Sequence, residues 1–185
     1  MEIKELSLSG LFMIIPDIHR DKRGYFFESF RGDMMTKFGL PATFIQDNQT
    51  KSEGGTLRGL HYQLKNPQGK LVRVSLGKVY DVAVDIRRGS PTFGHHWGTI
   101  LSDEGHMMMF IPEGFAHGFS VLSDTAIFQY KCTNIQHQED EYGLRWDDSE
   151  LNIDWKISNP TLSTKDSNLP ILKNIKDEHL PVYES

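Results

Sequence analysis

The stretch that decides the fold is Pro112-Glu113-Gly114-Phe115-Ala116-His117, in which a proline and a glycine precede a histidine. Proline and glycine shape turns, and the run 117–121 that follows has the composition of a β-strand. The run 57–63, Leu-Arg-Gly-Leu-His-Tyr-Gln, is also of β type and carries His61. These stretches predict a β-sheet protein in which both histidines lie on strands.

Short runs of β type, broken by Gly, Pro, Asn and Asp, make up most of the rest of the chain. Gly77-Lys78 between two of them predicts a tight hairpin turn. Helices are expected only at 32–38, with Asp33 near the N-terminus, and from about Ser163, with Asp166 in the first turn. Many short strands with few helices predict an all-β sandwich or barrel. The expected strands are 11–15, 25–30, 43–47, 57–63, 71–76, 79–86, 97–101, 107–111, 117–121 and 126–132.

The run 79–86 alternates between two faces, as the side chains of a strand do. One face carries Asp81 and Asp85 together with Val79 and Ala83. The two acids either line a polar barrel interior, where they could orient a basic side chain, or form a solvated outer face. The sequence leaves both alternatives open.

Composition limits the classes of protein that the chain can represent. Its 185 residues suit one domain over 1–185, with a peripheral tail from about residue 168 that contains Pro170 and Pro181. A formal charge of −5 argues against nonspecific nucleic-acid binding, which requires a basic surface. Cys132 is the single cysteine, so no intrachain disulfide forms, and a reducing cytoplasm is the expected location.

The N-terminal run Met1-Glu2-Ile3-Lys4-Glu5 lacks the basic and apolar regions of a signal peptide. No apolar run approaches the roughly 20 residues that span a bilayer. The sequence therefore predicts no membrane partner.

The pattern Pro-x-Gly-x-x-His at 112–117 resembles the second half of the cupin barrel signature. Metal-binding cupins carry His-x-His and a Glu in the first half, whereas the matching segment here is His61-Tyr62-Gln63. An amide oxygen is a poor ligand for zinc, iron or copper. The resemblance implies a cupin jelly-roll β-barrel with short peripheral helices, no metal and no cofactor. His61 and His117 are then free for proton transfer, and Asp166 is the candidate acid that holds His61.

Four motifs in order closely resemble the dTDP-4-dehydrorhamnose 3,5-epimerase family. They are the runs 54–63, 69–74, 111–119 and 130–133, and the resemblance extends over residues 3–170. It implies a homodimer that acts on a nucleotide sugar and converts dTDP-4-dehydro-6-deoxy-D-glucose to dTDP-4-dehydro-L-rhamnose.

The resemblance also implies the roles of individual residues. His61 is the proton acceptor, Tyr130 the proton donor, Asp166 the partner of His61, and Lys70 the neighbour of the C4 oxygen. Phe26 is expected to stack on thymine. The segment 23–28 is expected to reach the site of the neighbouring subunit. The other implied substrate contacts are Arg23, Glu28, Gln46, Asn48, Arg58, His117, Glu141 and Lys165.

These residue types suit inversion of a carbon beside a ketone. Loss of a proton there gives an enolate, whose charge gathers on the carbonyl oxygen, and a cation such as Lys70 stabilises it. A base and an acid on opposite faces of the sugar then invert the carbon. Arg23 and Arg58 provide planar donors for the diphosphate.

The sequence departs from the family after Thr133, where many members carry aromatic residues and this chain has Asn134-Ile135-Gln136-His137. The number of inverted carbons and the nucleotide therefore stay open. The alternatives are a C3-only or C5-only epimerase, an epimerase of a GDP-linked 4-keto heptose, a 3,4-ketoisomerase, a non-catalytic sugar-binding cupin and a metal-dependent cupin oxygenase. The remaining histidines, His95, His96 and His106, are interpreted as surface or loop residues.

Overall fold

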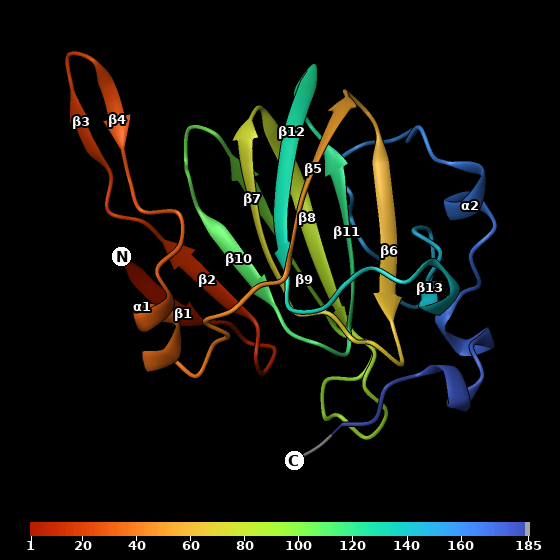
Figure 1. Cartoon of the computed structure of the whole chain (residues 1–185). Coiled ribbons are helices and arrows are strands. Elements are labelled where there is room, and N and C mark those ends of the chain that lie inside the picture. The colour runs from red at the N-terminus through yellow and green to blue at the C-terminus, as the bar shows by residue number, and fades with distance from the viewer. Residues whose placement is uncertain (184–185) are drawn as a thin grey trace.

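In the computed structural model, which describes residues 1–183, two antiparallel sheets face each other and form a jelly-roll barrel (Figure 1). The six-stranded sheet has the order β1-β2-β10-β7-β12-β5 and the five-stranded sheet the order β13-β6-β11-β8-β9. The predicted all-β cupin fold is confirmed.

The strands of the first sheet are β1 Glu2–Glu5, β2 Phe12–Ile15, β10 Met108–Ile111, β7 Lys70–Leu76, β12 Thr125–Cys132 and β5 Gln46–Glu53. Those of the second are β13 Glu141–Gly143, β6 Leu57–Gln63, β11 Phe115–Val121, β8 Lys78–Asp85 and β9 His96–Ser102. The strands β3 His19–Asp21 and β4 Gly24–Phe26 form a separate hairpin. The helices are α1 Gly32–Lys37 and α2 Thr164–Ser167, with 3-10 turns η1 Gln138–Asp140, η2 Leu172–Asn174 and η3 Asp177–His179.

The space between the sheets is divided between an apolar core and a polar cavity. Phe119 and Phe128 stack with their ring centroids 4.2 Å apart, belong to the main core cluster, and also line the cavity. Because closely packed aromatic rings hold their positions, they give the cavity a rigid apolar end.

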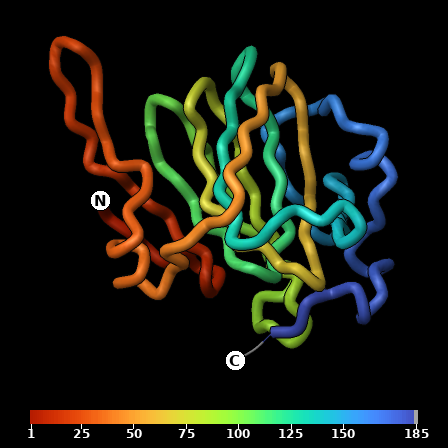
Figure 2. The backbone as a smooth tube through the Cα atoms, in the orientation of Figure 1, coloured from red at the N-terminus to blue at the C-terminus, as the bar shows by residue number. Residues whose placement is uncertain are grey.

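Strand β8 is buried on both faces, so a solvated outer face for Asp81 and Asp85 is wrong. Both carboxylates are fully buried on the inner side of the barrel. The other face of β8 packs under the C-terminal segment, where Trp155, Leu172 and Leu180 complete a second core cluster. Figure 2 shows this segment running along the side of the five-stranded sheet.

Most predicted elements are confirmed, and the misses share a cause. The expected strand 43–47 is instead β5, Gln46–Glu53, whose sequence QDNQTKSE has no apolar alternation. It is a strand because each of its residues is paired with β12. The strands β1, β3 and β13 were not predicted, since they are short or polar.

Of the two alternatives predicted for His106, a loop position is confirmed and a surface position is wrong. The residue is buried, and its ring centroid is 4.5 Å from Tyr25 and 4.9 Å from Phe27. The β3–β4 hairpin, which carries Tyr25 and is followed by Phe27, projects from the barrel (Figure 1). No helix in residues 1–183 is both long and apolar enough to cross a bilayer.

Candidate active site

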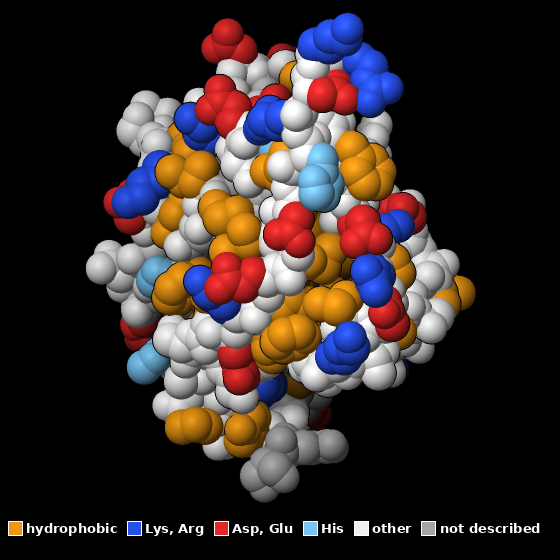
Figure 3. Space-filling view, turned by 90° about the vertical axis from the view of Figure 1, so that its left-hand side faces the viewer, with side chains coloured by type: hydrophobic (Ala, Val, Ile, Leu, Met, Phe, Trp, Pro, Cys, Tyr) orange, Lys and Arg blue, Asp and Glu red, His pale blue; other side chains and the backbone are white. Residues whose placement is uncertain are grey.

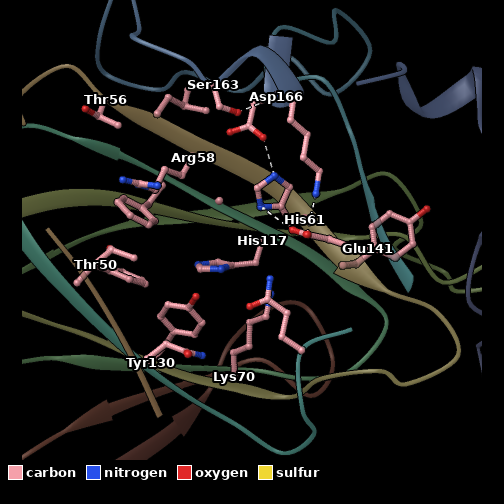
Figure 4. A pocket seen from close by; sticks show the side chains of 18 of the residues that line it. Thr50, Thr56, Arg58, His61, Lys70, His117, Tyr130, Glu141, Ser163 and Asp166 are labelled. Atoms are coloured by element: carbon pink, nitrogen blue, oxygen red, sulfur yellow. Dashed lines mark hydrogen bonds and ion pairs between the residues drawn. The ribbon is translucent and has the colours of Figure 1, made fainter. Parts of the chain in front are cut away.

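A cavity of about 500 Å³ opens between the two sheets, within the range of small-molecule sites. Strands β6 and β11 form one wall, strands β7 and β12 the opposite wall, and the segment that leads into α2 closes the rim (Figure 4). The cavity thus gathers side chains from segments that are far apart in the sequence. Nine predicted site residues line it, namely His61, Asn48, Arg58, Lys70, His117, Tyr130, Glu141, Lys165 and Asp166.

His61 and Asp166 form a tight pair. The distance from His61 Nε2 to Asp166 Oδ1 is 2.7 Å, and Asp166 Oδ2 also accepts a hydrogen bond from the backbone N–H of Gly59 at 3.4 Å. The Ser163 hydroxyl caps α2 by accepting from the N–H of Asp166, which fixes the carboxylate at the first turn. Burial would raise the pKa of Asp166, but the hydrogen bond and charge of His61 hold it below its ordinary value.

This pair sets the state of the imidazole. An ionised carboxylate only accepts hydrogen bonds, so Nε2 of His61 carries the proton that it donates to Asp166. The lone pair of neutral His61 is then on Nδ1. Asp166 therefore makes Nδ1 the basic atom of the ring.

The other side of the ring meets a second carboxylate. Glu141 Oε1 is 3.6 Å from His61 Nδ1, and Glu141 Oε2 is 2.7 Å from Lys165 Nζ. Glu141 begins β13, which pairs with β6 so that Glu141 is opposite Gln63. His61 thus lies between two carboxylates on two different elements.

A second histidine–aspartate pair lies deeper in the barrel. His117 Nε2 is 3.0 and 3.1 Å from the two oxygens of Asp81, and both residues are buried. His117 and His61 are register partners on β11 and β6. Of the alternatives left open for Asp81, an inner position beside a basic side chain is confirmed, and that side chain is His117. Asp85 instead binds Arg87 and has no contact with either histidine.

Tyr130 and Lys70 come from the opposite sheet. Tyr130 lies on β12 and Lys70 on β7, and Figure 4 shows both across the cavity from His61. Burial raises the pKa of Tyr130, so the phenol keeps its proton at neutral pH. Burial lowers the pKa of the Lys70 ammonium, which makes it a better hydrogen-bond donor to a developing oxyanion.

Arg58 and Asn48 also line the cavity. Arg58 Nε donates to the Ser52 hydroxyl at 3.0 Å, which orients the guanidinium. Gln46 lies just outside the cavity lining. Its side chain donates to Asn48 at 3.0 Å and accepts from the backbone N–H of Gln136 at 2.7 Å.

Three predicted contacts are not brought to the cavity of their own chain. Arg23 lies in the β3–β4 hairpin and binds Asp21 at 2.6 Å. Phe26 is 66% exposed on the same hairpin. Glu28 lies 3.7 Å from Arg31. The expectation that this segment serves a neighbouring subunit stays a prediction.

Gln63 has a role that the sequence did not indicate. It is buried, and its amide nitrogen donates to the carbonyls of Asn66 at 2.6 Å and Ile135 at 3.1 Å. Its amide oxygen accepts from the N–H of His137 at 2.7 Å. Gln63 therefore holds the segment that places Gln136 in the cavity wall. The only indication of this role in the sequence was the residue type, since a glutamine amide can both donate and accept hydrogen bonds.

The structure also adds lining residues that had no motif to mark them. They are Thr50, Thr56, Gln68, Phe128, Gln136 and Ser163. Within residues 1–183, no three His, Cys, Asp or Glu side chains are grouped in a way that would hold a metal ion.

A jelly-roll barrel with a histidine–carboxylate pair opposite a tyrosine and a lysine defines the class of cupin-type carbohydrate epimerases. A family model described as dTDP-4-dehydrorhamnose 3,5-epimerase matches residues 5–174. The enzyme of that name from Pseudomonas aeruginosa is 49% identical over 168 residues, which are 90% of this chain and 93% of the relative. The chain belongs to the dTDP-4-dehydrorhamnose 3,5-epimerase family, and it is an isomerase.

Solved structures extend the comparison. The dTDP-6-deoxy-D-glucose-3,5-epimerase from Legionella pneumophila Philadelphia 1, in complex with dTDP-4-keto-L-rhamnose, matches with a TM-score of 0.97 and 47% identity over 100% of this chain and 99% of that chain. A 3'-monoepimerase from Streptomyces bikiniensis, in complex with dTDP-quinovose, matches with a TM-score of 0.90 and 34% identity over 96% and 92%. The fold is therefore common to enzymes described as inverting two carbons and one carbon.

Proposed function

We propose that the protein inverts C3 and C5 of dTDP-4-dehydro-6-deoxy-D-glucose and gives dTDP-4-dehydro-L-rhamnose for nucleotide-sugar biosynthesis. The observation that carries the proposal is the placement of His61 and Tyr130 on opposite sheets, across one polar cavity. A base and an acid on opposite faces of a sugar ring are what inversion of a carbon requires. Family membership supports the nucleotide-sugar substrate.

In the proposed reaction, His61 Nδ1 takes a proton from the carbon beside the C4 ketone. The electron pair of the broken C–H bond forms an enolate, and Lys70 donates to its oxygen. Tyr130 gives a proton to the opposite face of the same carbon. Asp166 keeps Nδ1 basic and stabilises the imidazolium that forms.

The remaining cavity residues suit the binding of the nucleotide and the sugar. We assign Arg58 to the diphosphate because its guanidinium is already oriented by Ser52. Binding the remote nucleotide holds the reacting carbon near the base. The other proposed contacts are Gln46, Asn48, His117, Glu141 and Lys165.

We propose further that the enzyme is a cytoplasmic homodimer of single-domain chains. In this arrangement the β3–β4 hairpin would bring Arg23, Phe26 and the adjoining Glu28 to the partner's cavity. Tyr25 and Phe26 are 53% and 66% exposed on this hairpin, which is unusual for aromatic side chains without a partner surface. Figure 3 shows hydrophobic side chains between charged ones on the face from which the hairpin projects.

The test is incubation with dTDP-4-dehydro-6-deoxy-D-glucose in heavy water, followed by mass measurement of the sugar. Deuterium at both C3 and C5, absent in His61→Ala, is the expected result. Absence of deuterium at both carbons would contradict the proposal.

One-carbon epimerisation is the second candidate, and a specific feature favours it. The segment 134–137 departs from the family where it enters the cavity wall at Gln136, and a 3'-monoepimerase has the same fold. Deuterium at only one carbon in the same experiment would establish this alternative.

A further inference from the structure

We propose that Glu141, held by Lys165, carries away the proton that His61 takes from the sugar and so resets the base between inversions. The inference rests on the proposed epimerase function. It adds a proton path to that function.

The geometry places one carboxylate where it can receive the proton. Asp166 occupies Nε2 of His61 at 2.7 Å, so the proton from carbon arrives at Nδ1. Asp166 and Glu141 are the carboxylates that line the cavity within the described residues. Of these two, Glu141 is the one on the Nδ1 side, with Oε1 at 3.6 Å. A small movement of either side chain closes this distance to a hydrogen bond.

Water can reach the carboxylate that receives the proton. The Glu141 side chain is 16% exposed, and Lys165, which binds Glu141 Oε2 at 2.7 Å, is 49% exposed at the rim. Lys165 thus holds one carboxylate oxygen and leaves the other directed at the imidazole. Figure 4 shows Glu141 beside His61 on the side away from Asp166.

Proton accounting shows why a reset is needed. In one inversion the C–H bond breaks, its electron pair enters the enolate, and the proton bonds to His61 Nδ1. The O–H bond of Tyr130 then breaks, and its proton bonds to the opposite face of the carbon. The site is left with an imidazolium and a phenolate, and neither can act again until a proton leaves His61 and another reaches Tyr130.

The relay restores both groups without any reactant other than water. The proton on Nδ1 moves to Oε1 of Glu141, which then gives it to a water molecule. A second water molecule protonates the Tyr130 phenolate, and the hydronium and hydroxide that result neutralise each other. Because burial raises the pKa of Tyr130, the phenolate takes up its proton readily.

Glu141→Gln tests the relay because the amide has the same shape but does not accept the proton. Deuterium uptake in heavy water, followed by rapid quenching and mass measurement, separates the first inversion from later ones. We expect a burst of one deuterium per active site and then a phase slowed about 100-fold relative to the first, in the range of acid–base contributions. A variant with a merely structural defect would not give a burst of this stoichiometry.

Glu139→Gln is the matched control. Glu139 lies in the same 3-10 turn that precedes β13, its side chain is 78% exposed, and its charged neighbour is His137 rather than His61. Both phases should stay at the wild-type rate in this variant. Lys165→Met should slow the later phase, since Glu141 loses the ion pair that positions its carboxylate.

Equal slowing of both phases in Glu141→Gln, or no slowing of either, would overturn the relay. If the wild-type enzyme inverts one carbon only, the burst still reports the reset between turnovers. The absence of any uptake by the wild-type enzyme would instead overturn the proposed function and the relay with it.

Discussion

Asp166 determines which nitrogen of His61 is basic, and both of its oxygens are used. One oxygen accepts from His61 and the other from the backbone of Gly59. An asparagine at this position has a single acceptor oxygen, so one of the two donors loses its partner. The tautomer of His61 is therefore the property that Asp166→Asn changes.

We expect Asp166→Asn to lower kcat about 100-fold or more while the protein stays folded. An amide N–H directed at Nε2 would move the ring proton to Nδ1 and remove the base. Steady-state kinetics and the near-ultraviolet circular dichroism spectrum would be measured together. Asp147→Asn is the control, because Asp147 forms a surface pair with Arg145. Wild-type kcat in Asp166→Asn would contradict the assignment.

Tyr130→Phe removes the proposed proton donor and keeps the ring. Tyr130 makes aromatic contact with Phe128, with ring centroids 6.0 Å apart, and the phenylalanine preserves this contact. We expect kcat to fall by a factor of about 100 to 10,000 with little change in melting temperature. His61 would still remove protons, so the substrate should lose its C–H proton to solvent faster than it inverts. If inversion and exchange fell equally, Tyr130 would not be the donor.

At the scale of elements, hydrophobic alternation was a sufficient guide for the buried strands. Strands β6, β8, β11 and β12 were all predicted within two residues of their observed bounds, because each carries β-type residues between turn signals. The polar edge strand β5 was misplaced, since its stability comes from pairing with β12 and not from its own pattern. The cavity walls could therefore be predicted, but the full set of lining residues could not.

Local sequence patterns also predicted only part of the candidate site. His61, Lys70, His117 and Tyr130 could be predicted because they lie within motifs on confirmed strands. Gln63 was interpreted only as a lost metal ligand, since a sequence does not show which loop a buried amide binds. The contacts of such a residue depend on chain segments that are brought together by folding.

Gln63→Ala should loosen the segment 135–137 and raise KM more than it lowers kcat. The variant loses two bonds to carbonyls and one from an N–H, which should cost about 1–3 kcal/mol of unfolding free energy. Urea unfolding and steady-state kinetics would measure both effects. Gln49→Ala, which removes an exposed bond to Gln129, should change neither quantity. An unchanged KM in Gln63→Ala would show that the segment does not need this clamp.

At the scale of the whole molecule, buried carboxylates govern the response to acid. Asp85 is fully buried and accepts from Arg87, Ser90 and Thr92. Burial would raise the pKa of Asp85, but these hydrogen bonds bring it below its ordinary value. A lowered pKa in the folded state means that the stabilisation is fully present above the unfolded pKa of about 3.9 and is lost as the pH falls through the folded value.

Unfolding free energy should therefore decline as the pH is lowered below about 4, and Asp85→Asn should decline less steeply. At neutral pH the same variant should be less stable by about 3 kcal/mol, because Arg87 loses its buried partner. Chemical denaturation from pH 3 to pH 7 would measure both effects. A wild-type slope in Asp85→Asn would assign the acid response to other carboxylates.

In the proposed dimer, two variants that are inactive for different reasons should complement each other. Neither Arg23 nor Phe26 lines the cavity of its own chain, so a hairpin that serves the partner's cavity can be supplied by another copy. Arg23→Ala/Phe26→Ala has a defective hairpin and an intact His61, whereas His61→Ala has the reverse. We expect each variant alone to be nearly inactive.

Mixing the two variants under conditions that exchange subunits should restore activity. In the mixed dimer, the chain that keeps His61 receives an intact hairpin from its partner, which rebuilds one site of the two. Equal mixing gives half mixed dimers, so about a quarter of the wild-type activity should return if subunits pair at random and each site acts independently. Light scattering should show a mass twice the 21.2 kDa of one chain. A mixture with no more activity than its components would mean that the hairpin serves its own chain or none.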